Sequence, residues 1–91
     1  MKLQIDLDEN IAQGVYSNFA VVNHSDADFV IDFIYLQPMQ PKAKVRSRII
    51  TTPKHAKKLL AALTDNINKY EKAFGPIPPD PEEGSNQDLM H

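Results

Sequence analysis

Residues 52–75, TPKHAKKLLAALTDNINKYEKAFG, carry the clearest periodic pattern in the chain. A threonine that can cap precedes a proline suited to the first helical position, and a glycine followed by proline marks the other end. Between these signals, apolar side chains recur every three or four residues, which is the spacing of one helix face. The stripe consists of Ala56, Leu60, Leu63, Ile67, Tyr70 and Phe74, widened by Leu59. These signals predict a helix over residues 53–74 whose apolar stripe must be buried.

The chain before this helix has the pattern of four strands. Residues 2–7 alternate apolar and polar side chains, as a strand with one wet face does. Residues 15–24 and 28–36 are rich in Tyr, Phe and Val around a polar turn, and residues 42–52 follow two prolines. Residues 8–14 predict a turn or a single helical turn. We therefore expect an α+β domain in which a four-stranded antiparallel sheet, with strands in chain order, is crossed by a helix roughly 33 Å long.

Alternation within the strands predicts which side chains share a face of the sheet. Odd-numbered residues of the third and fourth strands are expected on the face that the helix covers. These are Phe29, Ile31, Phe33 and Tyr35 with Ala43, Val45, Ser47 and Ile49. The opposite face would then place Asp28 and Asp32 across from basic side chains.

Length and composition indicate one small, mildly acidic domain. The 91 residues include 10 Lys plus Arg, 12 Asp plus Glu and no Cys, which excludes disulfides and thiolate chemistry. The N-terminus has no apolar signal region, and no apolar run approaches the roughly 18 residues of a membrane span. A cytoplasmic location without membrane contact is expected. We assign residues 1–75 to the domain and residues 76–91, proline-rich and acidic, to a disordered tail.

Several short segments are similar to a known family. They are GVYSNF at 14–19, HS at 24–25, DFVIDF at 28–33, PKAKV at 41–45 and TPKHAK at 52–57. On these segments, residues 3–75 resemble family 3467 of small bacterial domains of unknown function. The resemblance implies a bacterial, cytoplasmic protein, and it supplies no activity, cofactor or catalytic residue. The SecB-type export chaperone, an oligomer built on a four-stranded sheet and a helix, offers a distant analogy of fold without a shared motif.

The strongest charged feature is a comb of four cations at alternate positions of one strand. It consists of Lys42, Lys44, Arg46 and Arg48, and Lys54, Lys57 and Lys58 follow at the start of the helix. Cations in this arrangement can follow a phosphate backbone, so nucleic-acid binding is one interpretation. The alternative is a solvated face paired with Asp28 and Asp32, which the acidic balance of the chain favours.

Two polar clusters raise catalytic hypotheses. His24, Asp26 and Asp28 could form a site for metal-assisted hydrolysis, although the same residue types close hairpin turns. A pairing of Ser17 with His55 lacks an orienting third group and a nucleophile elbow, and three glycines provide no phosphate loop. We therefore predict no cofactor, no metal and no catalytic residue.

A second apolar surface remains on the predicted sheet face that the helix does not cover. It comprises Ala20, Val22, Val30, Ile34 and Leu36. A second copy of the chain is the simplest cover for such a surface. The sequence thus predicts a non-enzymatic binding or adaptor protein that acts as a homodimer or higher oligomer, with a protein partner or nucleic acid as its target.

Overall fold

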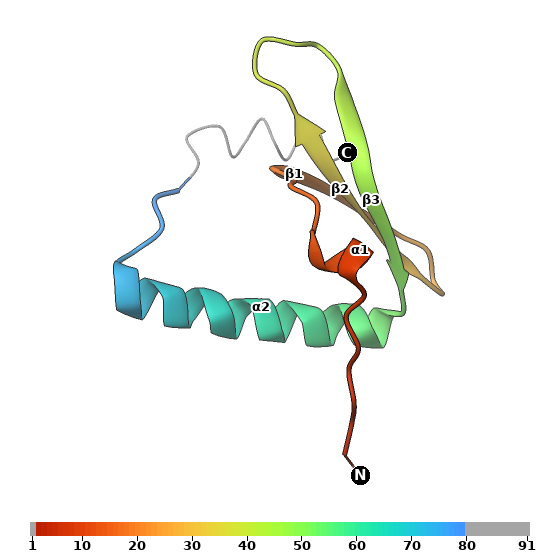
Figure 1. The fold of residues 1–91 in the computed structure, drawn as a ribbon, viewed down its shortest axis with the longest axis vertical. Coiled ribbons are helices and arrows are strands. Elements are labelled where there is room, and N and C mark those ends of the chain that lie inside the picture. The colour runs from red at the N-terminus through yellow and green to blue at the C-terminus, as the bar shows by residue number, and fades with distance from the viewer. Residues whose placement is uncertain (1, 80–91) are drawn as a thin grey trace.

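The computed structural model describes residues 2–79 as a three-stranded antiparallel sheet followed by one long helix (Figure 1). The elements are α1 (Glu9–Ala12), β1 (Phe19–His24), β2 (Phe29–Leu36), β3 (Ala43–Thr51) and α2 (Pro53–Phe74). The strands lie in the order β1-β2-β3. The central strand, β2, is the most apolar of the three. The α+β class, the two hairpins and the final helix are confirmed.

The predicted first strand, over residues 2–7, is wrong. Residues 2–7 form neither helix nor strand, and their apolar side chains Leu3, Ile5 and Leu7 are exposed. Alternation indicates which face a strand would bury, but it does not provide a neighbouring strand with free hydrogen-bonding groups. The sheet is therefore narrower than the four-stranded sheet on which the SecB analogy rests. Residues 8–14 were expected to form a turn or a single helical turn, and the structure shows the second of these as α1.

The first observed strand starts later than predicted, at Phe19 instead of near Val15. Asn18 stands immediately before it and bonds to β2 through both backbone and side chain. Its N–H donates to the Ile34 carbonyl at 3.1 Å, while its side-chain amide exchanges two hydrogen bonds with the backbone of Leu36. A side chain thus completes the end of the β1–β2 ladder.

A β-bulge interrupts the pairing of β2 with β3. Phe33 lies opposite Ser47 and Ile34 lies opposite Val45, which leaves Arg46 as the extra residue on β3. An extra residue reverses the alternation of every side chain beyond it. The predicted sharing of one face is therefore confirmed between the bulge and the end of β3, where Ile31 pairs with Ile49, but α2 does not cover that face. Ala43 and Val45 are corrected to the opposite face, where they lie across from Leu36 and Ile34.

Helix α2 has the predicted bounds and the predicted cap signals. The Thr52 hydroxyl accepts a hydrogen bond from the His55 N–H at 3.2 Å, and Pro53 is the first helical residue. At the other end, the Gly75 N–H donates a hydrogen bond to the Glu71 carbonyl. Gly75 has a φ of 96°, a backbone conformation that a residue with a side chain rarely adopts.

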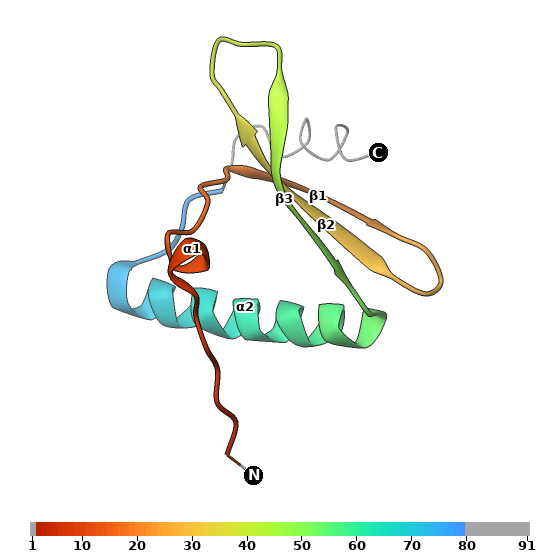
Figure 2. The ribbon, with the colours of Figure 1, turned by 45° about the vertical axis from the view of Figure 1, so that its right-hand side comes forward.

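The sheet does not bury the apolar stripe of α2. Figure 2 shows the helix and the sheet diverging from the junction at Thr52, and close packing between elements is confined to the strands. Ala56, in the first turns, is half-buried, whereas Leu60 and Leu63 are 64% and 54% exposed. Within residues 2–79, the buried apolar side chains are Ile31 and Ile34, so a single copy of the chain has a very small core.

Four residues of the predicted tail, 76–79, belong to the described part of the structure. The Ile77 N–H donates to the Glu71 carboxylate at 2.8 Å, so the chain after Gly75 bonds back to the last turns of α2. The remainder of the predicted tail, residues 80–91, lies outside the described residues. Among residues 2–79, no helix is both long enough and apolar enough to cross a membrane.

Candidate functional site

The predicted comb of four cations does not share one face of the sheet. Arg48 lies opposite Asp32 on one face, and Lys44 lies opposite Tyr35 on the other because the bulge at Arg46 stands between them. The sequence-based prediction assumed regular alternation along the strand, which a bulge interrupts, and therefore placed all four cations on one face. The comb therefore consists of two parts with different partners.

The first part is an ion pair between Arg48 and Asp32. The Arg48 Nε and Nη2 donate to the two carboxylate oxygens at 2.7 and 2.9 Å, a two-point contact that fixes both groups. Asp32 is 7% exposed, while the Arg48 side chain remains 60% exposed. The hydrogen bonds from Arg48 hold the pKa of Asp32 below its ordinary value, and burial of the carboxylate opposes that effect. The same pairing raises the pKa of Arg48. Pairing across the hairpin, expected for Asp32, is thus confirmed.

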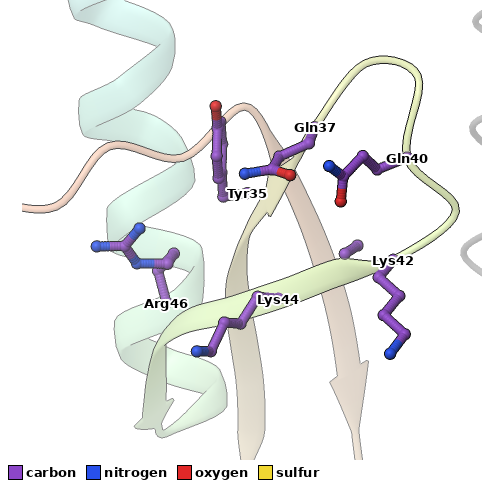
Figure 3. A pocket seen from close by; sticks show the side chains of 7 residues that line it. Tyr35, Gln37, Gln40, Lys42, Lys44 and Arg46 are labelled. Carbon is purple, nitrogen blue, oxygen red and sulfur yellow. The ribbon is translucent and has the colours of Figure 1, made fainter.

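The second part lines a pocket of ≈ 380 Å³ where β2 ends and β3 begins (Figure 3). Its lining residues are Tyr35, Gln37, Gln40, Lys42, Ala43, Lys44 and Arg46. In residues 2–79 the ion pairs are Arg48 with Asp32 and Lys69 with Asp65, so no described carboxylate neutralises the three cations of this pocket. The pocket combines positive charge, amide groups and an aromatic ring, which the sequence reasoning did not connect.

The ring of Tyr35 is held by a second tyrosine. Tyr16 packs edge to face against it, with ring centroids 6.0 Å apart and an angle of 77° between the rings. Tyr35 is half-buried and Tyr16 is exposed. Residues 15–18, expected to belong to a strand, therefore place an aromatic side chain beside the pocket.

The cations of α2 lie elsewhere. Lys54, Lys57 and Lys58 are exposed on the first turns of the helix, which follow the end of β3, whereas the pocket is at its beginning. In Figure 1, the start of α2 and the β2–β3 loop stand at opposite ends of β3. The seven predicted binding cations thus occupy three separate places.

The five residues predicted as an oligomer face lie on two faces. Ala20 and Val22 lie opposite Phe33 and Ile31, so they share the face that carries Ile49. Val30, Ile34 and Leu36 point to the face of Asp32. The prediction placed even-numbered residues of both strands on one face. In the β1–β2 register, even-numbered residues of β1 lie opposite odd-numbered residues of β2, so the prediction was wrong for Ala20 and Val22. Each face nevertheless retains exposed apolar side chains, including Val22 and Ile49 on one and Val45 and Ile50 on the other.

The polar residues around His24 close the first hairpin. Ser25 Oγ accepts hydrogen bonds from the Ala27 and Asp28 N–H groups at 3.2 Å, and the Ser25 N–H donates to the Asp28 carbonyl. The His24 ring stacks on Phe29 with centroids 5.3 Å apart. In residues 2–79, no three His, Asp or Glu side chains converge on a common metal position. The geometry of this hairpin therefore matches a turn.

His55 belongs to the helix cap. Its Nδ1 lies 3.2 Å from the Thr52 hydroxyl, the same oxygen that accepts from the His55 N–H. Within the described chain, Ser17 shares no hydrogen bond with His55, so the imagined serine and histidine pairing is not assembled.

Comparison with known proteins supplies a family without an assigned activity. No curated protein and no solved structure matches the chain. The family model described as "Protein of unknown function (DUF3467)" matches residues 1–78, which include every helix and strand of the structure. The chain belongs to this family of proteins of unknown function.

Proposed function

We propose that the protein is a binding module that acts as a homodimer, in which α2 of each copy covers the sheet of the other. The observation that carries this proposal is the exposed apolar stripe of α2. Leu59, Leu63 and Tyr70 are each about half exposed, and Phe74 is 77% exposed. A helix with such a stripe is stable in water when another apolar surface covers it.

The exposed area of a single copy supports an interface of dimeric size. The chain exposes 8531 Å², whereas a compact protein of 10.3 kDa exposes about 5,400 Å². The difference between these two areas is the excess exposed surface. Even if residues outside 2–79 exposed the full area of an extended chain, the area beyond their share of a compact surface would be at most about half of this excess. At least about 1,600 Å² remain for each copy, within the range of stable homodimer interfaces.

The same chain offers a second apolar surface for the stripe, which favours a second copy as the cover. Val22, Ile31 and Ile49 lie side by side on one face of the sheet, and Val22 and Ile49 are exposed. A single residue, Thr52, separates β3 from α2, so the helix leaves its own sheet in a fixed direction (Figure 2). In a two-fold dimer, the helix of each copy meets the part of the other sheet that bears Val22 and Ile49, which the bulge separates from Tyr35 and Lys44.

Light scattering after size exclusion tests the assembly on the full chain. A homodimer has twice the mass of 10.3 kDa, and its thermal midpoint rises with protein concentration because folding and association are coupled. Leu63→Glu places a charge in the stripe and should weaken association by at least 100-fold, or about 3 kcal/mol. Ala61→Glu adds the same side chain on the opposite side of α2 and should leave the mass unchanged. A monomer at micromolar concentration, or equal effects of the two variants, would contradict the proposal.

The ion pair of Arg48 with Asp32 does not support nucleic-acid binding through the entire basic strand. A bacterial origin and a cytoplasmic location remain predictions from the sequence. Catalysis is not part of the proposal, because the described clusters around His24 and His55 are hairpin and cap residues.

A further inference from the structure

We infer that the pocket of Tyr35, Lys44 and Arg46 binds single-stranded nucleic acid, with the phosphates on the cations and a base on the tyrosine. All of its residues come from one copy of the chain. The inference therefore goes beyond the homodimer proposed above and does not depend on it.

The first argument is the uncompensated charge. The pocket gathers Lys42, Lys44 and Arg46, and no carboxylate of residues 2–79 forms an ion pair with them. Like charges in one place repel one another, and an anionic ligand removes that repulsion. Phosphates along a nucleic-acid strand provide several negative charges in a row, which suits cations distributed along β3.

The bulge produces this separation of charge. With regular alternation, Lys44 and Arg46 would share the face of Arg48 and approach Asp32. The extra residue at Arg46 instead places Lys44 opposite Tyr35, and Arg48 alone pairs with the carboxylate. Bulges commonly re-aim side chains in this way beside functional sites.

The second argument is the aromatic ring in the same pocket. Figure 3 shows Tyr35 and Arg46 on the same side of the sheet, with Lys44 between Arg46 and Lys42 along β3. Tyr16 packs edge to face against the Tyr35 ring at the side of the pocket. An aromatic ring beside a basic groove is the usual platform for an unpaired base, whereas a duplex keeps its bases stacked internally.

The amide groups complete the ligand chemistry. Gln37 and Gln40 belong to the loop between β2 and β3, and their side chains offer donors to phosphate and both donors and acceptors to base edges. The loop is shaped by a Gln40 N–H bond to the Gln37 carbonyl and by Met39, whose φ is 73°.

The net charge of the described part agrees with an anionic ligand. All ten Lys and Arg residues lie within residues 2–79, together with eight of the twelve Asp and Glu residues. The acidic balance that argued against nucleic acid thus comes from the four acidic residues of 80–91.

Fluorescence anisotropy of the full chain tests the inference, with a labelled single-stranded RNA of about 12 nucleotides and mixed sequence as the probe. We expect binding that weakens with salt. The double variant Lys44→Gln/Arg46→Gln should lower the affinity at least tenfold and reduce the salt slope by about 1.4, because two phosphate contacts are lost.

A matched control separates this pocket from general attraction by positive charge. Lys54→Gln/Lys57→Gln removes two exposed cations from the first turns of α2, which follow the end of β3 that is distant from the pocket. This variant should change the affinity less than about twofold. Tyr35→Leu should lower the affinity by about fivefold or more through lost stacking, and Tyr35→Phe should retain binding. Circular dichroism and light scattering on each variant verify its fold and its mass.

Three results would overturn the inference. One is no binding of the probe at about 50 mM salt. Another is an equal loss of affinity in the Lys54→Gln/Lys57→Gln control. The third is equal affinity for the matching duplex with no effect of Tyr35→Leu, which would show attraction to any polyanion. Because mass is measured separately, failure of this site is distinguishable from failure of the homodimer.

Discussion

Arg48 holds the Asp32 carboxylate through two hydrogen bonds across the centre of the sheet, at 2.7 and 2.9 Å. Asp32 is nearly inaccessible on β2, between Val30 and Ile34 on the same face. A carboxylate at such a position requires a fixed positive partner, and the planar guanidinium supplies one with matching geometry.

This ion pair predicts an acid-dependent loss of stability. Arg48 keeps the pKa of Asp32 below its ordinary value of 3.8, so the stabilisation is present above that pH. It is lost as the pH falls through the lower value in the folded protein. Arg48→Gln and Asp32→Asn should each reduce the dependence of the free energy of unfolding on pH below 3.8, measured by urea denaturation. Unchanged pH dependence in Arg48→Gln would contradict this role.

The side chain of Asn18 is predicted to stabilise the start of the sheet. It exchanges two hydrogen bonds with the backbone of Leu36, at 2.8 and 3.0 Å. Asn18→Ala should lower the free energy of unfolding by about 1 to 2 kcal/mol, because both bonds are lost. Asn23→Ala, at the exposed far end of β1, is the matched control and should cost less than about 0.5 kcal/mol. Equal effects of the two variants would argue against the Asn18 contact.

The cap of α2 predicts a difference between two substitutions at one position. Thr52→Ala removes the oxygen that accepts from the His55 N–H and should cost about 1 kcal/mol, whereas Thr52→Ser retains it. Thr64→Ala, on an exposed turn of the same helix, should be neutral or slightly stabilising because alanine favours helices. Thermal unfolding followed by circular dichroism at a fixed protein concentration measures all three. A loss in Thr52→Ser as large as in Thr52→Ala would contradict the cap.

Gly75 is predicted to be required for its backbone conformation. Its φ of 96° and ψ of 167° belong to a region that residues with a side chain rarely adopt. Apart from the two neighbouring residues in the chain, nothing lies within 4 Å of the position that a Cβ would occupy, so the cost of Gly75→Ala comes from the backbone conformation. We expect a loss of about 1 to 3 kcal/mol in the free energy of unfolding, measured with urea. A neutral Gly75→Ala would mean that the end of α2 relaxes without cost.

The sequence alone determined the features that depend on neighbouring residues. The bounds of α2 follow from Thr52, Pro53 and Gly75, whose effects act within a few residues along the chain. The two hairpins follow from β-branched and aromatic runs interrupted by turn residues. The ion pair of Asp32 with Arg48 was also expected, because both residues lie on the regular side of the bulge.

Tertiary structure decided the features that depend on partners distant in the chain. Residues 2–7 have the alternation of a strand, but no sheet edge pairs with them. The extra residue at Arg46 reversed the faces of Lys44 and Val45, since a single bulge changes every position beyond it. The apolar stripe of α2 was predicted to be buried against the sheet, but the direction of the helix after Thr52 leaves the stripe exposed. Periodicity indicates which side chains seek burial, and only the path of the chain in three dimensions determines which surface is available to bury them.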